Sequence, residues 1–192
     1  MLYKVKPKLN LVLARFMLRD FQRVPGTTDD RTFPDIGDGY GLARSIDILE
    51  LLRVLIVSNW GRARTLIDLG CGDGVVLRVA SKISIATIIG IESDSQIARL
   101  AQSNNPSALV INSKFEEWNV AGLELDRYII YAFNPTYFKF LLTAINNILV
   151  QHEGCIAIVL KNINEDLSGI KSKKQFKTKE WNSFKIIKFF DN

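Results

Sequence analysis

The sequence has few of the residues on which disulfide frameworks, metal centres and histidine-based catalysis depend. Its 192 residues include two cysteines, Cys71 and Cys155, and one histidine, His152. The cysteines match no metal-ligand spacing, and we expect them not to pair, which fits a reducing compartment. With a single histidine, a histidine-based zinc centre or catalytic triad is a poor fit to this chain. We therefore predict no metal, and chemistry that needs little acid–base catalysis.

Long hydrophobic runs are also missing. No stretch reaches the roughly 20 apolar residues needed to span a bilayer. Lysines within residues 4–8 precede an apolar run that Arg15 soon breaks, and no small-residue cleavage site follows. We expect a soluble, cytoplasmic protein in which residues 7–24 form a basic amphipathic helix. Two roles stay open for this helix, which are packing on its own domain and contact with a membrane surface.

The composition that is present fits a globular chain. Apolar residues make up 47% and charged residues 23%, with a net charge of +5. This mildly basic balance suits an acidic partner such as nucleic acid or an anionic membrane without naming one. Residues 25–41 are rich in turn-forming residues and are predicted to form a lid loop. We divide the chain into an N-terminal helix and lid, 1–41, and a single domain, 42–192.

From residue 64 onward, short apolar segments alternate with helical patterns. This alternation predicts a parallel sheet covered by helices on both faces. A helix is also expected over residues 42–58, and a terminal hairpin over 176–190 with its turn near Trp181. The expected strands are 64–69, 86–92, 107–112, 127–133 and 154–161, and the helices between them are 74–82, 94–103 and 136–150.

The most informative segment runs from Asp68 to Gly74 and reads D-L-G-C-G-D-G. Alternating glycines let the backbone turn sharply and approach a ligand closely, and the next helix offers free N–H groups there. A dinucleotide fingerprint would need a third small residue where Val75 stands, and Asp68 would repel a diphosphate. A cationic ligand suits the site better, although a tight turn without a ligand would also use these glycines.

This segment resembles the first motif of class I S-adenosylmethionine-dependent methyltransferases, and the resemblance covers residues 42–190. It implies an α/β fold with a doubly wound, mostly parallel seven-stranded sheet of the Rossmann-like kind and a C-terminal antiparallel hairpin. It also implies S-adenosyl-L-methionine as cofactor and a transferase that catalyses methylation. The cofactor contacts that it implies are Asp68, Gly70, Cys71, Gly72, Gly74, Glu92, Ser93, Ser113, Phe115 and Asn134.

Glu92 ends the second expected strand and is predicted to accept hydrogen bonds from the ribose hydroxyls. The alternative, helix capping, is already served by Ser93 and Asp94. The family usually has an acid after the third strand, but this chain has Ser113 there, so the hydroxyl or Asn112 would contact adenine. Two roles stay open for Phe115, which are packing beside the adenine and anchoring a short helix.

The fourth strand ends at Asn134-Pro135-Thr136-Tyr137, which resembles the N-P-P-Y motif of methyltransferases that act on amino nitrogens. An amide oxygen and the proline carbonyl can polarise the hydrogens of a planar nitrogen, and Tyr137 can stack on the planar group. Thr136 departs from the second proline of that motif. Asn134 as a helix cap with Pro135 in the first turn explains the same residues and is compatible with catalysis.

These patterns predict an S-adenosylmethionine-dependent methyltransferase with Asn134, Pro135 and Tyr137 at the acceptor site. The favoured acceptor is a nitrogen of a protein side chain or small molecule. The alternatives are an RNA methyltransferase, favoured by the basic surface, and a non-catalytic cofactor-binding or interaction subunit. The C-terminal lysines from Lys161 to Lys188 would track a phosphate backbone or, as is usual, form a solvated face.

Overall fold

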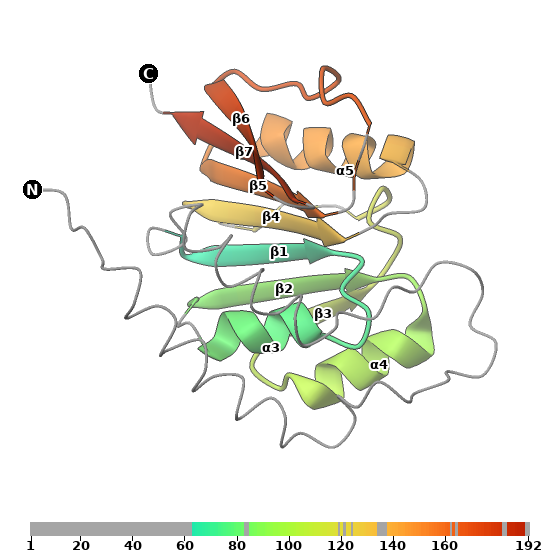
Figure 1. Cartoon of the computed structure of the whole chain (residues 1–192). Helices are drawn as coiled ribbons and strands as arrows, with labels where there is room; N and C mark the ends of the chain where they lie inside the picture. Colours follow the sequence, from blue (N-terminus) through green and yellow to red (C-terminus); the bar gives the residue numbers. More distant parts are fainter. Residues whose placement is uncertain are drawn as a thin grey trace, which may run out of the picture.

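The computed structural model describes residues 63–82, 85–118, 120, 122–123, 125–133, 138–161, 163, 165–181 and 184–190. These residues form a single seven-stranded sheet with helices on both faces (Figure 1). The predicted N-terminal helix, lid loop and helix over residues 42–58 lie outside the described residues. In chain order the elements are β1 (Thr65–Leu69), α3 (Val75–Lys82), β2 (Thr87–Glu92), α4 (Ser95–Asn104), β3 (Leu109–Asn112), β4 (Tyr128–Phe133), α5 (Phe138–Gln151), β5 (Cys155–Lys161), β6 (Gln175–Trp181) and β7 (Phe184–Phe190).

The strand order is β3-β2-β1-β4-β5-β7-β6. The first five of these strands run parallel, whereas β7 is antiparallel to both β5 and β6. The order reverses between β1 and β4, which leaves a crevice at the carboxyl ends of these two neighbours. The doubly wound sheet and the C-terminal antiparallel hairpin predicted from the sequence are therefore confirmed.

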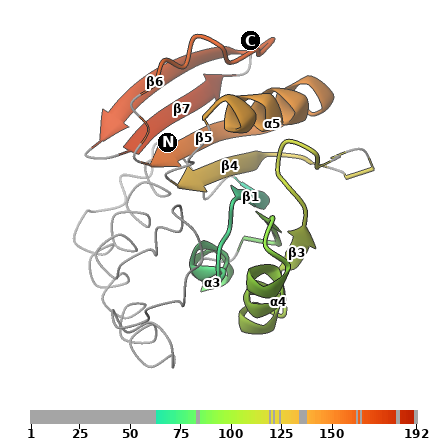
Figure 2. The same ribbon diagram turned by 90° about the vertical axis from the view of Figure 1, so that its right-hand side faces the viewer.

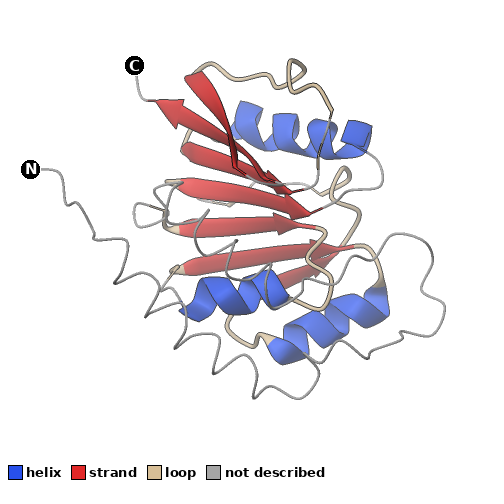
Figure 3. Cartoon of the chain, in the orientation of Figure 1, coloured by secondary structure: helices blue, strands red, loops and turns tan. Residues whose placement is uncertain are grey.

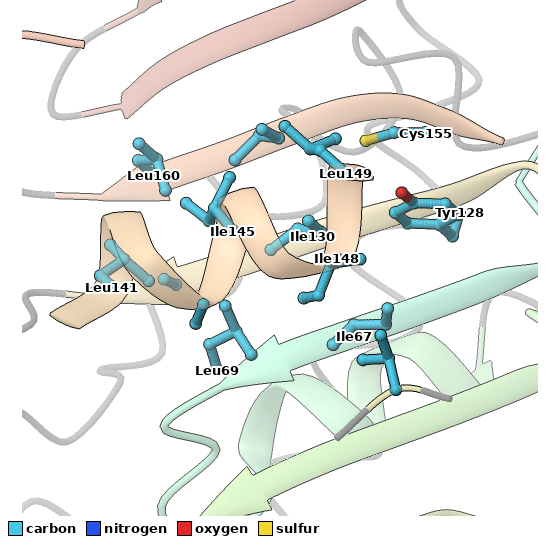
Figure 4. Close-up of a cluster of buried hydrophobic side chains, with 14 of the residues drawn as sticks. Ile67, Leu69, Tyr128, Ile130, Leu141, Ile145, Ile148, Leu149, Cys155 and Leu160 are labelled. Carbon is cyan, nitrogen blue, oxygen red and sulfur yellow. The ribbon is translucent and has the colours of Figure 1, made fainter. Parts of the chain in front are cut away.

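Two buried clusters fill the two sides of the sheet. Because side chains alternate along a strand, Leu66 joins α3 in one cluster while Ile67 joins α5 in the other. Helix α5 buries the residues at helical spacing that face β4 and β5 (Figure 4): Leu141, Ala144, Ile145, Ile148 and Leu149. Figure 3 shows α5 beside β4 and β5, with α3 and α4 near β2 and β3.

The central strands are near-continuous apolar runs, which is typical of parallel strands covered on both faces. All five residues of β1 are buried, as are five of the six in β4. The outermost strand, β6, is different, because residues 175–180 are all exposed. Figure 2 shows this strand at the far edge of the sheet from β3. The centre of the sheet is thus buried on both faces, whereas its β6 edge carries exposed, charged side chains.

Each strand and helix that the sequence predicts among the described residues is present, with bounds shifted by a few residues. The two cysteines are buried in the clusters on opposite sides of the sheet, Cys71 with α3 and Cys155 with α5. In the part of the chain that the structure describes, no helix has the length and apolar character needed to cross a bilayer.

Candidate cofactor-binding site

The candidate site lies at the carboxyl ends of β1, β2 and β4, next to the crevice where the strand order reverses. Asp68 pairs in register with Gly90 on one side and Tyr131 on the other. Because Asp68 follows Leu66 by two residues, it points to the same sheet face as α3. Residues expected from the sequence to share a site therefore do share one edge of the sheet.

The loop after β1 has the backbone that its glycines predict. Gly70, Gly72 and Gly74 all have positive φ, at 83°, 54° and 85°. The N–H groups of Gly70 and Cys71 both donate to the Ile91 carbonyl at 2.9 Å, which holds the loop against β2. A Cβ at Gly70 or Gly72 would meet no heavy atom of the described residues within 4 Å, which leaves room for a ligand beside the backbone among those residues.

Asp68 is buried, and no described residue compensates its carboxylate. Its side chain is 1% exposed, and no group in the described part of the chain donates a hydrogen bond to either carboxylate oxygen. Burial, and secondarily the charge of Glu92, raises the pKa of Asp68 well above its usual range. An unpaired buried carboxylate is costly to a folded protein. A cation bound beside Asp68 would remove that cost.

Glu92 has a role that the sequence did not reveal. One of its carboxylate oxygens, Oε2, accepts the Gly72 N–H at 3.0 Å, and the other, Oε1, accepts the Asp94 N–H at 2.9 Å. This 4%-exposed side chain therefore ties the end of β2 to the glycine loop. Asp94 caps α4 by accepting from the backbone N–H groups of Gln96 and Ile97, so Glu92 is not needed as a cap.

Some glycines and the cysteine of this region have packing roles. A Cβ at Gly90 would lie 2.7 Å from Leu77 Cδ1 and 2.8 Å from Cys71 Sγ. Gly90 thus allows the glycine loop and α3 to close on β2. A Cβ at Gly74 would collide with the Asn105 side chain, which gives Gly74 a packing reason of its own. Burial raises the pKa of the Cys71 thiol, which keeps it neutral.

The residues after β3 lie beside Glu92. The Asn112 side-chain amide donates to the carbonyls of Glu92 and Ser93 at 2.9 Å, and the Ser113 N–H donates to the Glu92 carbonyl. The Ser113 hydroxyl donates to the Lys114 carbonyl. The half-buried Phe115 packs against the cluster on the α5 side, which favours its anchoring role.

The predicted acceptor residues Asn134, Pro135 and Tyr137 lie outside the described residues. Phe133, the last residue of β4, directly precedes them and is at the same edge as Glu92. His152 is at the opposite edge, because its carbonyl accepts the Tyr128 hydroxyl at the start of β4. Its ring contacts the Val120 carbonyl at 3.2 Å. His152 is therefore away from the candidate site.

Comparison with known proteins now bears on this geometry. No protein-family model matches the sequence, and no curated protein matches it significantly. The fold matches the N-terminal domain of human METTL16 in complex with SAH, with a TM-score of 0.59 and 11% identity over 95% of this chain and 82% of that one. It also matches the methyltransferase domain of bacterial CtHen1-C, with a TM-score of 0.52 and 12% identity over 75% of this chain and 97% of that one. The chain has the class I methyltransferase fold.

A third structure of similar fold is monomeric WbdD, with a TM-score of 0.51 and 16% identity. The match covers 90% of this chain and 48% of that one, so the chain spans about half of WbdD. Likeness at these identities establishes the class I methyltransferase fold. It leaves substrate and activity to be argued from the site.

One residue at this edge of the class I methyltransferase fold was misjudged from the sequence. Lys161 was grouped with the lysines of a solvated face, but it is 3% exposed and ends β5. Its ammonium lies 5.3 Å from the centre of the Phe133 ring and 5.1 Å from that of Phe184. The strand-end rule that singled out Asp68 and Glu92 would also have found Lys161. Among the described residues, no group of histidine, cysteine or acidic side chains is arranged to hold a metal.

Proposed function

We propose that the protein is an S-adenosylmethionine-dependent methyltransferase that acts on a planar nitrogen. The observation that carries this proposal is the buried Asp68 carboxylate, for which no described residue supplies a donor. S-adenosylmethionine carries an ammonium and a sulfonium group, and either would compensate the charge of Asp68. A pyrophosphate ligand would instead add a like charge beside it.

The residues present fit this cofactor in shape as well as charge. The open space beside Gly70 and Gly72 would admit it to the loop backbone, and Asp68 would face its cationic part. Glu92 accepts the backbone N–H groups of Gly72 and Asp94 and, at 3.4 Å, the Ser93 hydroxyl. Its carboxylate at the end of β2 would accept a ribose hydroxyl in exchange for the longer Ser93 bond. When bound, the cofactor supplies an electrophilic methyl group.

Transfer of a methyl group to a neutral nitrogen depends mainly on alignment and on exclusion of water. The sequence offers Asn134 and Pro135 as acceptors for the hydrogens of that nitrogen, and Tyr137 as a stacking surface. In the sequence they directly follow Phe133, the last residue of β4, and β4 pairs with β1, which carries Asp68. This sequence position supports the proposed role. The acceptor favoured by the motif is a protein side chain or small molecule, with RNA as the alternative. Preserved methyl transfer in Asn134→Ala would count against the polarising role.

Calorimetric titration with S-adenosylmethionine and its demethylated product tests the proposal. We expect micromolar binding to the native protein. Asp68→Ala should lose about 100-fold or more in affinity, because removing one partner of a buried charge pair costs roughly 3–5 kcal/mol. Glu92→Gln should weaken binding less than Glu92→Ala, since its amide oxygen still accepts one hydrogen bond.

Asp126→Ala is the matched control, because this carboxylate is exposed and pairs with Arg64 at the surface. It should bind the cofactor as the native protein does. If the folded native protein binds neither compound, the proposal is overturned. If it binds both but transfers no methyl group to any acceptor offered, the non-catalytic cofactor-binding subunit is the better description.

A further inference from the structure

The β6–β7 hairpin gathers cations on one of its two faces. The register pairs Lys177 with Lys188 and Lys179 with Ile186, and Ile186 belongs to the cluster on the α3 side. Lys177, Lys179, Lys188 and Phe190 therefore share that face, which we call the hairpin basic face. Same-face residues along a strand lie about 7 Å apart. The lysines thus form a row rather than a scatter.

This arrangement is unfavourable for the isolated protein. Lys177 and Lys188 are directly opposite each other on neighbouring strands, where like charges destabilise a sheet. Burial, with the nearby charge of Lys179, lowers the pKa of Lys188. Within the described ranges, no carboxylate forms an ion pair with Lys177 or Lys179. Glu180, next along β6, points to the other face by strand alternation. An anionic ligand would relieve this repulsion.

An aromatic ring stands among these cations. Phe190 is 43% exposed, and the Lys177 ammonium lies 5.7 Å from the centre of its ring. Lysines on an edge strand often serve only to prevent pairing with another chain. That role needs charge alone and gains nothing from an exposed ring. Cations in a row with a stacking surface are what single-stranded nucleic acids bind.

The row also leads toward the candidate site. Strand β6 is parallel to β5, because both are antiparallel to β7. Lys161 at the end of β5 pairs with Phe184 of β7, and Phe184 pairs with Trp181 at the end of β6. The carboxyl ends of β5 and β6 therefore lie at the same edge of the sheet as Asp68 and Glu92. A chain bound along the hairpin basic face would therefore run toward the acceptor end of β4.

We propose that the hairpin basic face binds single-stranded nucleic acid, with lysines on the phosphate backbone and a base on Phe190. This inference deepens the proposed function and rests on it in one respect: the acceptor nitrogen would be an amino group of a nucleobase. The binding itself requires no methyl transfer. It favours the alternative acceptor class, a nucleic acid, over the protein side chain or small molecule that the motif after β4 favours.

Fluorescence anisotropy with a labelled RNA of about 15 nucleotides tests this proposal in the full chain. Lys177→Gln/Lys179→Gln should weaken binding about tenfold or more at about 0.1 M salt. It should also reduce the slope of log affinity against log salt by about 1.4, which is about 0.7 for each lost phosphate contact. Phe190→Ala should weaken binding about fivefold or more and leave that slope unchanged, because stacking is uncharged.

Helices α3 and α5 supply matched controls. Lys82→Gln/Lys139→Gln removes the same charge from exposed positions outside the hairpin, and Phe140→Ala removes an equally exposed ring of α5. Both controls should bind RNA nearly as the native protein does. Equal weakening by the control lysine pair would overturn the proposal, as would native-like binding by Lys177→Gln/Lys179→Gln.

Two further outcomes would contradict it. Binding of anionic vesicles or heparin as tightly as RNA, with no effect of Phe190→Ala, would identify a general polyanion surface. Self-association of the hairpin variant with unchanged RNA binding would assign the lysines to edge protection. Lys177→Gln/Lys179→Gln should bind S-adenosylmethionine with native affinity in a calorimetric titration. Loss of RNA binding and failure of the cofactor proposal are therefore distinguishable.

Discussion

Two regions of the sheet carry charge in opposite ways. At the carboxyl ends of the interior strands β1 and β2, which we call the β1–β2 end, Asp68 and Glu92 are acidic, buried and held by the strand ends and the glycine loop. At the β6–β7 end, Lys177 and Lys179 are basic, exposed and distributed along a strand. A buried charge needs a partner at one fixed point, whereas exposed charges suit an extended partner that makes several weak contacts.

The β1–β2 end therefore suits a compact ligand, whereas the β6–β7 end suits a polymer. Asp68 costs stability whenever it is ionised and unpaired, and under the proposed function the cationic part of the cofactor would offset that cost. The lysines cost little individually, and their register and the exposed Phe190 ring beside them make them informative. The predictions below separate the two ends by the size of their effect on stability.

The largest effect is expected at Asp68. Burial raises its pKa in the folded protein, so the folded state holds a proton there more tightly than the unfolded chain does. The stability linked to this proton is fully present below pH about 4 and is lost as the pH rises through the folded pKa. Asp68→Asn has no titratable group at this position, so its unfolding free energy should not fall in this way as the pH rises. Above the folded pKa it should raise the unfolding free energy of the ligand-free protein by about 3 kcal/mol.

Urea unfolding at a series of pH values measures this effect. Asp126→Asn is the control, and its pH profile should follow that of the native protein because the carboxylate is exposed. Saturating S-adenosylmethionine should reverse the order, since only the native protein gains the binding free energy. A native pH profile identical to that of Asp68→Asn would mean that Asp68 is compensated in the free protein.

A smaller effect is expected where the glycine loop closes on β2. Gly90→Ala should lower the unfolding free energy by about 2 kcal/mol, because its Cβ would overlap Leu77 and Cys71. Gly70→Ala should cost about 1 kcal/mol, since its Cβ meets open space but its φ of 83° disfavours a side chain. Cofactor affinity should fall more in Gly70→Ala. Thermal unfolding measures the stability of each variant, and calorimetry measures its cofactor affinity. The prediction is wrong if the same variant is the more impaired one in both measurements.

The smallest effect belongs to the hairpin. Lys177→Glu replaces a like-charge pair across the strands with an opposite-charge pair facing Lys188. It should raise the unfolding free energy by about 0.5 kcal/mol at low salt, and the gain should vanish at about 1 M salt. Lys139→Glu on α5 should show no such gain. A salt-independent change in Lys177→Glu would point to packing rather than to charge.

The sequence predicted the β1–β2 end well because its information there is local. An apolar strand, its acidic residue and the alternating glycines all lie within one short segment. Asp68, Gly70 and Gly72 could therefore be singled out together. Glu92 followed from the rule that parallel strands end at one edge. Its hydrogen bond to Gly72 could not be foreseen, because it depends on a side-chain rotamer across two strands.

The hairpin end could not be predicted in the same way. Whether Lys177 and Lys188 oppose each other depends on the register, and a shift of one residue would move each lysine to the other face. The sequence also cannot say that β7 lies between β5 and β6, which is what buries Lys161 beside Phe184. The roles of Asn134, Pro135 and Tyr137 stay predictions, as do the lid and the N-terminal helix.

The position of β7 has a consequence for synthesis on the ribosome. Strand β5 emerges first, but its outer neighbour in the sheet, β7, follows only after the loop and β6 have been made. During that interval the apolar edge of β5 is open to pairing with any other extended chain. The nascent protein therefore has an aggregation-prone stage that ends only when the last strand inserts between two earlier ones.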